Sequence, residues 1–372
     1  MERSGILEAM TLVSPVGMGS FLMGICFCLC FPKYSGQNQS LSLLSPIWSP
    51  FMAVRIALLD DYLQVALDLA PWHTLPPEFT LEVFSEPFGS EVEAVEKLQN
   101  FEILVAMRER TRFPESLLTQ LPNLRLLVTT GMCNRSIDME FARQQGVSVC
   151  GTRMLGDSTA ELTWALILGL VRKLPAEHQA MQSGGWHVGL GLGLKDKTLG
   201  LFGLGKLGSQ VAKIGLAFGM RVSAWSENLT KERCAEVGVQ RVEREELFRE
   251  SDVLSIHVVL SERTRGTVGQ QELSWMKPSA FLVNTSRGPI IEETALLNAL
   301  EHQRIAGAGI DVYDQEPLPA DHPLRLVPNA LLTGHCGYVT RENFQQAYGD
   351  AVEDLRAWHS GNPVRVLNVA PA

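Results

Sequence analysis

The sequence predicts an α/β protein with two Rossmann-like or flavodoxin-like parallel-sheet domains and a cleft between them. From residue 54 onward, short apolar runs alternate with helix-length amphipathic segments, which is the βα pattern of a parallel sheet. Most runs are apolar throughout, as expected for strands that helices cover on both faces. The chain of 372 residues is long enough for two buried cores.

The apolar runs fall into two sets, separated by a helical stretch at 159–174. The first set of predicted strands is Val54–Leu59, Leu81–Phe84, Ile103–Ala106, Leu126–Thr130 and Val147–Cys150. The second set is Thr198–Phe202, Val222–Trp225, Val253–Val258, Phe281–Asn284, Ala308–Val312 and Leu331–Thr333.

A final helix is predicted over 341–359, with Thr340 as its N-cap. One face of this helix is apolar, and it carries Phe344, Tyr348, Ala351, Leu355 and Trp358. Because the helix follows the end of the second sheet, we expect it to return to the first domain. The first domain would then comprise 52–157 together with 340–372, and the second 158–339.

Composition favours small-molecule chemistry. The net charge is −9, and no basic run of nucleic-acid-binding type is present, so no nucleic-acid partner is expected. The seven cysteines are odd in number and form no C-x-x-C pair, which predicts neither a disulfide framework nor a zinc site. We expect reduced thiols, a cytoplasmic location and no bound metal.

Residues 1–51 do not match the rest of the chain. Residues 11–31 form an uncharged run of about transmembrane length, but the residues before it lack a basic n-region. The run is a membrane anchor, a targeting segment or an extension that is irrelevant to the fold. We favour the extension and expect the folded part to begin at residue 52, without a membrane partner.

A glycine motif opens the second domain. Gly203, Gly205 and Gly208 form G-x-G-x-x-G, with Lys206 and Leu207 inside it. An apolar strand precedes the motif and a helical stretch, 209–218, follows it. In this setting the glycines allow a tight turn, backbone access to a pyrophosphate and close helix–sheet packing, and the helix N-terminus attracts the phosphates. The motif predicts a dinucleotide site.

Cofactor choice depends on the end of the next strand. An acidic residue there binds the ribose hydroxyls of NAD, and this position falls on Ser226, followed by Glu227. Lys231 and Arg233 are close enough in sequence to favour the 2′-phosphate of NADP instead. We favour NAD, bound through Glu227, with NADP as the alternative.

Three polar residues follow later strands and suit the reduction of a 2-keto acid. Arg287 offers a two-pronged fork for a carboxylate, and His335 can give and take a proton near neutrality. Glu316 would stabilise and orient the imidazolium. Since ligands bind outside the carboxyl ends of strands in open α/β sheets, we expect the three side chains to converge.

At this point the chain resembles the D-isomer-specific 2-hydroxyacid dehydrogenases, from Val54 to its C-terminus. The resemblance rests on the glycine motif and on four further segments in order, which are Met276-Lys277-Pro278, Asn284-x-x-Arg287-Gly288, Asp311-x-x-x-x-Glu316-Pro317 and His335-x-Gly337-x-x-Thr340. It implies Arg287 as the substrate-carboxylate ligand, Glu316 as partner of the acid/base His335, and Asp311 near the nicotinamide. It also implies a discontinuous catalytic domain and a homodimer.

Further site residues are predicted beside these motifs. Thr285 joins the cofactor-binding set, and Arg108, after a first-domain strand, is a candidate substrate ligand. The family loop that holds the substrate carboxylate usually reads G-x-G, whereas here it reads Gly131-Met132-Cys133. Ser226 replaces the usual ribose-binding aspartate, and Val259 replaces a usual proline.

The sequence thus predicts an NAD(P)-dependent oxidoreductase that interconverts a 2-keto acid and a D-2-hydroxy acid. Two other hypotheses are an NAD-sensing binding module, since some relatives act as transcriptional corepressors, and an enzyme tethered to a membrane through residues 11–31. Motif spacing does not encode the identity of the keto acid, because specificity lies in loop geometry, and it does not set the direction of flux.

Overall fold

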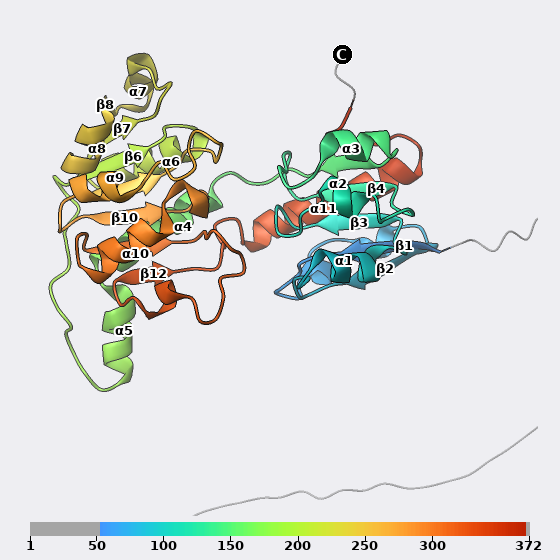
Figure 1. Ribbon diagram of the computed structural model, residues 1–372, viewed down its shortest axis with the longest axis horizontal. Helices are drawn as coiled ribbons and strands as arrows, with labels where there is room; N and C mark the ends of the chain where they lie inside the picture. Colours follow the sequence, from blue (N-terminus) through green and yellow to red (C-terminus); the bar gives the residue numbers. More distant parts are fainter. Residues whose placement is uncertain (1–52, 370–372) are drawn as a thin grey trace, which may run out of the picture. The chain divides into compact units, whose positions relative to one another are not determined.

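The computed structural model describes residues 53–369, and two sheets organise them (Figure 1). One sheet has five strands in the order β2-β1-β3-β4-β5, and the other has seven in the order β12-β11-β10-β9-β6-β7-β8. Neighbouring strands within each sheet pair in parallel. The predicted pair of parallel α/β sheets is therefore confirmed. The proposed N-terminal extension, with its apolar run 11–31, lies outside the described residues.

The five-stranded sheet has the strand order of a flavodoxin-like domain. Its central strand β3 is buried along its whole length, in agreement with the apolar run from which it was predicted. The strands are β1 (Val54–Leu58), β2 (Phe79–Val83), β3 (Ile103–Ala106), β4 (Leu126–Thr129) and β5 (Ser148–Gly151). The helices before β6, apart from α4 and α5, are η1 (Ala66–Asp68), η2 (Trp72–Thr74), α1 (Glu91–Leu98), α2 (Glu115–Leu118) and α3 (Met139–Gln144).

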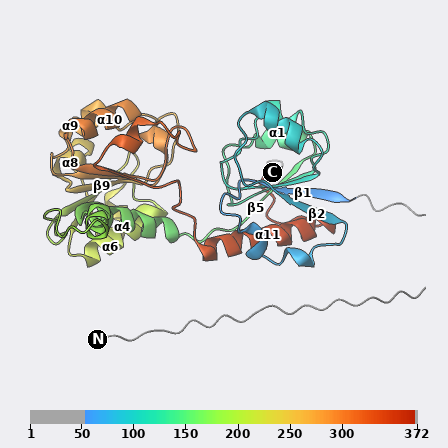
Figure 2. The same ribbon diagram turned by 90° about the horizontal axis from the view of Figure 1, so that it is seen from below.

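Helices cover both faces of this sheet. Residues of α1, α2 and α3 pack on one face, and α11 (Arg341–His359) packs on the other. Figure 2 shows α1 and α11 on opposite sides of the strands. The apolar stripe of α11 explains its position, because Phe344, Tyr348 and Leu355 are buried in one cluster with strand residues. The N-cap prediction is confirmed, since Thr340 Oγ1 accepts from the N–H of Asn343 at 3.3 Å.

The seven-stranded sheet has the Rossmann order. From one edge, β8-β7-β6-β9-β10-β11 follows the pattern 3-2-1-4-5-6 of doubly wound nucleotide-binding domains, and β12 extends it. The strands are β6 (Thr198–Phe202), β7 (Arg221–Trp225), β8 (Gln240–Arg241), β9 (Val253–Ile256), β10 (Phe281–Asn284), β11 (Gly307–Ile310) and β12 (Ala330–Leu332).

Two helical layers enclose the seven-stranded sheet (Figure 2). The cluster on one face includes α4 and α6, and the cluster on the other includes α8, α9 and α10. The helices of this part are α4 (Ser158–Val171), α5 (Leu174–Gln182), α6 (Lys206–Ala217), α7 (Lys231–Val237), α8 (Arg244–Glu250), α9 (Gln270–Trp275), η3 (Gly288–Ile290), α10 (Glu293–Glu301) and η4 (Pro323–Leu326).

Two local predictions were wrong. The stretch 159–174 was predicted as a single helix, but α4 ends at Val171 and α5 begins at Leu174. The break lies at Lys173, whose φ is 56°, just before Pro175, which has no N–H to continue the helical ladder. The helix predicted at 209–218 begins earlier, at Lys206, because Gly205 is its N-cap. The last glycine of the motif, Gly208, therefore lies inside the first turn.

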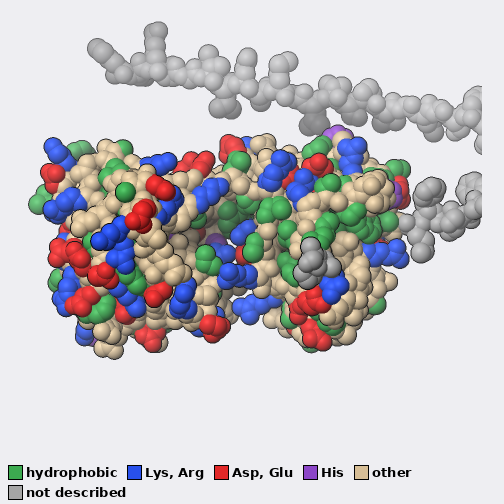
Figure 3. Space-filling view, turned by 90° about the horizontal axis from the view of Figure 1, so that it is seen from above, with side chains coloured by type: hydrophobic (Ala, Val, Ile, Leu, Met, Phe, Trp, Pro, Cys, Tyr) green, Lys and Arg blue, Asp and Glu red, His purple; other side chains and the backbone are tan. Residues whose placement is uncertain are grey.

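Two further features are the hydrophobicity of the helices and the distribution of charge on the surface. No helix within residues 53–369 combines the length and apolar character that a bilayer crossing requires. On the face shown in Figure 3, acidic and basic side chains are interspersed over the part that carries the seven-stranded sheet.

Candidate active site

The glycine turn lies between β6 and α6, at the point where strand order reverses in the seven-stranded sheet. Gly203 has a φ of +112°, and a Cβ there would lie 2.8 Å from the backbone of His257 after β9. A Cβ on Gly208 would lie 2.3 Å from the carbonyl oxygen of Gly203. These two glycines are therefore required by backbone packing.

Gly205 differs from its two neighbours in the motif. It is the N-cap of α6, and among the described residues no atom outside the immediate chain would lie within 4 Å of a Cβ there. The space beside it is open, at the N-terminus of a helix whose free N–H groups attract anions. No side chain of the motif fills this space, so an anion could approach the backbone there.

The other two motif residues lie at the start of α6. The ammonium of Lys206 extends over Gly156, since a Cβ at that glycine would meet Lys206 Nζ at 2.3 Å. Leu207 is half-buried. Lys206 thus covers the chain segment that leads into α4.

The end of β7 carries the residues predicted to choose the cofactor. Ser226 is half-buried and Glu227 is exposed. Arg233 reaches back to α6, where its Nη2 donates to Ser209 Oγ at 2.9 Å. The fold therefore places a guanidinium beside α6 and an exposed carboxylate just beyond β7.

His335 and Glu316 form the first pair of the predicted trio. His335 Nδ1 lies 2.5 Å from Glu316 Oε2, and the other carboxylate oxygen accepts from the N–H of Tyr313 at 2.9 Å. Burial opposes the charge on Glu316, but the hydrogen bond and charge of His335, the Tyr313 N–H and the Arg287 charge together hold the pKa of Glu316 below its ordinary value. The ring is thereby anchored by an ionised carboxylate.

Asp311 builds the turn that presents His335. Its buried carboxylate accepts from the N–H groups of Cys336 at 2.8 Å and Gly337 at 3.0 Å, and from Thr333 Oγ1 at 2.6 Å. Its carbonyl accepts from the N–H of His335 at 2.7 Å. These bonds support the left-handed backbone of His335, with a φ of 51°, which is uncommon outside glycine.

Tyr338 and Arg110 complete the surroundings of the histidine. The Tyr338 ring packs edge-to-face on His335, with centroids 5.6 Å apart. Arg110 lies 5.7 Å from the Tyr338 ring centroid and 4.3 Å from that of Tyr62. Tyr338 was not among the predicted site residues, although its position three residues after His335, in the same turn, indicates that the two side chains are close.

Arg287 follows β10 in a turn that Asn284 holds. The Asn284 side chain donates to the carbonyl of Arg287 at 3.0 Å and accepts from the N–H of Ser286 at 3.0 Å. A Cβ on Gly288 would lie 2.1 Å from the backbone of Tyr313, so only glycine fits. These contacts explain the motif Asn284-x-x-Arg287-Gly288 physically.

The guanidinium of Arg287 contacts the first domain. Its Nη1 donates to the carbonyl of Ser286 at 2.8 Å, and its Nη2 lies 3.2 Å from Glu109 Oε1. The same Glu109 oxygen lies 3.5 Å from Arg108 Nη2. Glu109 was not among the predicted site residues, yet it joins the two arginines predicted to bind substrate.

The predicted substrate loop follows β4. Gly131 has a φ of +105°, and a Cβ there would lie 1.9 Å from Arg108 Nη1. That nitrogen donates to the carbonyl of Thr130 at 3.3 Å. The absent side chain of Gly131 thus gives Arg108 room to lie over the loop, while Met132 and Cys133 are exposed.

Thr285, predicted to bind cofactor, is buried and faces α4. Its hydroxyl lies 2.8 Å from that of Thr163. His257, at the end of β9, contacts Ser255 Oγ through Nε2 at 2.9 Å, and burial lowers the pKa of His257 to about 4. His257 is therefore neutral near pH 7 and makes a structural contact beside the glycine turn.

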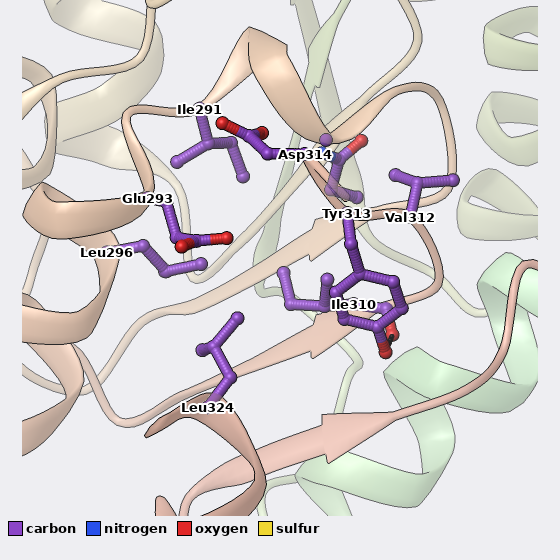
Figure 4. A pocket seen from close by; sticks show the side chains of 10 residues that line it. Ile291, Glu293, Leu296, Ile310, Val312, Tyr313, Asp314 and Leu324 are labelled. Carbon is purple, nitrogen blue, oxygen red and sulfur yellow. Dashed lines mark hydrogen bonds between the residues drawn. The ribbon is translucent and has the colours of Figure 1, made fainter. Parts of the chain in front are cut away.

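A small cavity of about 20 Å³ lies behind the Arg287 turn. Asn284, Gly288 and Tyr313 form part of its wall, and Figure 4 shows the carboxylates of Glu293 and Asp314 beside apolar side chains. A cavity of this size holds about one water molecule. It is too small for a substrate or a dinucleotide.

The chain resembles known proteins in both sequence and fold. Residues 164–337 match the NAD binding domain of the D-isomer specific 2-hydroxyacid dehydrogenases. A glyoxylate reductase from Aeropyrum pernix is 40% identical over 263 residues, which cover 68% of this chain and 78% of that protein. Two solved structures are also similar. A phosphoglycerate oxidoreductase from Vibrio cholerae has a TM-score of 0.78 at 36% identity, with 83% and 99% of the two chains covered. An acyclic imino acid reductase, in complex with NADPH and D-Arg, has a TM-score of 0.64 at 27% identity, with 84% and 99% covered.

Proposed function

Since the chain belongs to the D-isomer specific 2-hydroxyacid dehydrogenase family, we propose that it reduces a 2-keto acid to the D-2-hydroxy acid, reversibly. Family membership makes it an oxidoreductase with an NAD-binding domain. The observation that carries the proposal is the pairing of His335 with Glu316 at 2.5 Å, at the same sheet edge as Arg287. A keto acid requires a proton donor at its keto oxygen and a cation at its carboxylate. A histidine paired with a carboxylate supplies the first, and a guanidinium supplies the second.

Each side chain has one role in the proposed reaction. His335 gives its proton to the keto oxygen through Nε2, because Nδ1 is held by Glu316. Glu316 stabilises the protonated ring and fixes its orientation. Arg287 binds the carboxylate and so aligns the keto carbon.

The dinucleotide would be held by the turn at 203–208 and the N-terminus of α6, where Gly205 leaves open space. When bound, the nicotinamide supplies or accepts the hydride. Asp311 follows β11 and holds the turn that carries His335. Thr285 follows the neighbouring strand β10. We retain both as residues of the cofactor side of the site.

The first experiment follows NADH and NADPH oxidation by absorbance with glyoxylate, pyruvate, hydroxypyruvate, phenylpyruvate and 2-ketoisocaproate. We expect turnover of at least one acid, and its abolition in Arg287→Ala. Tight NAD binding without any turnover would contradict the proposal and favour an NAD-sensing binding module. The same panel names the substrate, and chiral chromatography of the product tests the D configuration.

The cofactor proposal is NAD, bound through Glu227, with NADP as the alternative. Glu227 is exposed just beyond β7, where a carboxylate would accept from the ribose hydroxyls. Arg233 lies nearby, on Ser209, and would suit a 2′-phosphate. Dissociation constants for NADH and NADPH, measured with wild type and Glu227→Gln, decide between them. NADPH bound more tightly by wild type would overturn the preference.

We also propose a homodimer. Large apolar side chains are exposed along α5 and the segment after it, which is unusual for a surface that only water contacts. They are Leu174, Met181, Trp186, Val188 and Leu190. A second copy of this chain, placing the same surface against them, would bury this apolar area. Light scattering after gel filtration tests the mass, and a monomer at micromolar concentration would contradict the proposal.

A further inference from the structure

Glu109 places an internal carboxylate on the predicted substrate anchor. Its Oε1 lies 3.2 Å from Arg287 Nη2 and 3.5 Å from Arg108 Nη2. A single carboxylate oxygen therefore lies between the two guanidiniums that were predicted to bind the carboxylate of a substrate. The Glu109 side chain is 21% exposed, so water screens this arrangement only partly.

The second oxygen of Glu109 is not satisfied. Oε2 is buried and accepts no hydrogen bond from any residue between 53 and 369. A buried carboxylate oxygen without a donor costs free energy, so the carboxylate is not held in place by a complete hydrogen-bond network. It can therefore be displaced from Arg287 at a lower cost than a fully bonded group.

The neighbouring Arg110 forms no ion pair with Glu109 among the described residues, because its guanidinium is directed to other groups. Arg110 Nη1 donates to the carbonyl of Asp60 at 2.7 Å, and its guanidinium lies against the Tyr62 and Tyr338 rings. The three side chains that meet at Glu109 are Arg108, Arg287 and Glu109 itself, and their charges sum to one positive charge (two cations and one anion). This sum matches a singly charged anion.

We propose that Glu109 is a specificity-determining residue that restricts the site to 2-keto acids with a single negative charge. This inference rests on the proposed function, since it assigns the substrate class of that same site. A monocarboxylate replaces Glu109 on Arg287 and leaves the displaced carboxylate near Arg108. A dicarboxylate brings a second negative charge toward Glu109, and like charges at close range are repelled.

The test compares two acids with the same five-carbon chain, 2-oxopentanoate and 2-oxoglutarate, which differ by one carboxylate. The enzymes are full-length wild type, Glu109→Gln and Glu115→Gln. Glu109→Gln removes the charge with little change in shape. Glu115 is exposed on α2, so Glu115→Gln controls for the loss of one charge. Melting temperatures confirm that all three proteins fold.

We expect Glu109→Gln to lower KM for 2-oxoglutarate about tenfold and for 2-oxopentanoate only about threefold, as for loss of a partly screened charge. The kcat values should stay within about twofold of wild type, because Glu109 contacts no reacting atom in the proposed pose. Glu115→Gln should match wild type for both acids. An unchanged ratio of the two KM values in Glu109→Gln would overturn the inference.

A second readout separates this inference from the proposed function. Calorimetry measures the dissociation constants of the two acids for each protein with NAD⁺ present, whether or not turnover occurs. If wild type reduces no 2-keto acid, the proposed function fails, but the ratio of the two Kd values still tests Glu109. If wild type reduces 2-keto acids and both ratios are unaffected by Glu109→Gln, the inference alone fails.

Discussion

The imidazole of His335 and the carboxylate of Glu316 lie 2.5 Å apart, between Nδ1 and Oε2, although the two residues are 19 positions apart in the chain, with η4 and β12 between them. This contact leaves Nε2 as the nitrogen available to a substrate. It also fixes the tautomer, because an ionised carboxylate can only accept a proton from Nδ1. The low pKa of Glu316 keeps the carboxylate ionised near neutrality.

Glu316→Gln should therefore lower kcat by about 10²-fold, with KM changed much less, because the amide cannot stabilise the imidazolium. Steady-state kinetics with the substrate found in the panel measures both values. Glu353→Gln is a matched control, since Glu353 is an exposed residue of α11. A Glu316→Gln enzyme with wild-type kcat would show that the carboxylate only supports the loop.

Asp311→Asn should disturb the His335 turn. The aspartate accepts from two backbone N–H groups and a hydroxyl, and an asparagine would turn an NH₂ group toward one of these donors. We expect a loss of about 1–3 kcal/mol in the free energy of unfolding and a lower kcat. Urea denaturation and kinetics test the two effects. Wild-type stability would contradict the role given to Asp311.

The glycine turn offers a matched pair of substitutions. Gly203→Ala should destabilise the fold by about 1–3 kcal/mol, because its Cβ meets the His257 backbone and its φ is +112°. Gly205→Ala meets nothing within 4 Å among the described residues and should keep wild-type stability. It should instead raise the Kd for NADH about tenfold, or ~1.4 kcal/mol, by filling the phosphate cradle.

Thermal melts and fluorescence titration with NADH separate these two outcomes. Equal destabilisation by both substitutions would show that the open space at Gly205 has no special purpose. Unchanged NADH affinity in Gly205→Ala would contradict the phosphate cradle.

The raised pKa of Asp354 predicts how the stability of the protein depends on pH. It is fully buried on α11, and its Oδ1 accepts from Arg365 Nε at 3.1 Å. Burial raises the pKa of Asp354 to about 7, although Arg365 opposes this. Between about pH 4 and pH 7, Asp354 therefore keeps its proton in the folded protein, whereas in the unfolded chain it has already released it. This group's contribution to stability is largest below pH 4 and is lost as the pH rises toward 7.

Asp354→Asn cannot titrate, so the comparison with wild type isolates this group from the other carboxylates. Relative to wild type, Asp354→Asn should gain stability between pH 4.5 and pH 8. Urea denaturation of both proteins at the two pH values measures the difference. A difference that does not change with pH would contradict the raised pKa.

Local sequence patterns predicted most strands. They also predicted that His335, Glu316 and Arg287 follow strands of the second sheet. The strand β10, for example, was predicted over 281–284 and spans these residues, because an apolar run buried on both faces leaves a clear signal. The strand β8 was missed, since its two residues, Gln240 and Arg241, are polar. Pairing at a sheet edge, rather than residue type, makes them a strand.

Long-range contacts were not predictable from one sequence. Glu109 and Arg287 are 178 residues apart, and nothing in the run Arg108-Glu109-Arg110 distinguishes a site residue from solvated charges. Asp311 was expected near the nicotinamide, but its hydrogen bonds to the 333–337 turn depend on β11 and β12 pairing side by side. Such roles follow from tertiary structure rather than from spacing.

The central claim is that His335 performs the proton transfer of a 2-keto acid reduction. The most direct test is the kcat of His335→Ala for NADH-dependent reduction of the best substrate, with the Kd for NADH measured on the same protein. We predict a fall in kcat of about 10²- to 10⁴-fold with an unchanged Kd. A His335→Ala enzyme that binds NADH and turns over at the wild-type rate would contradict the claim.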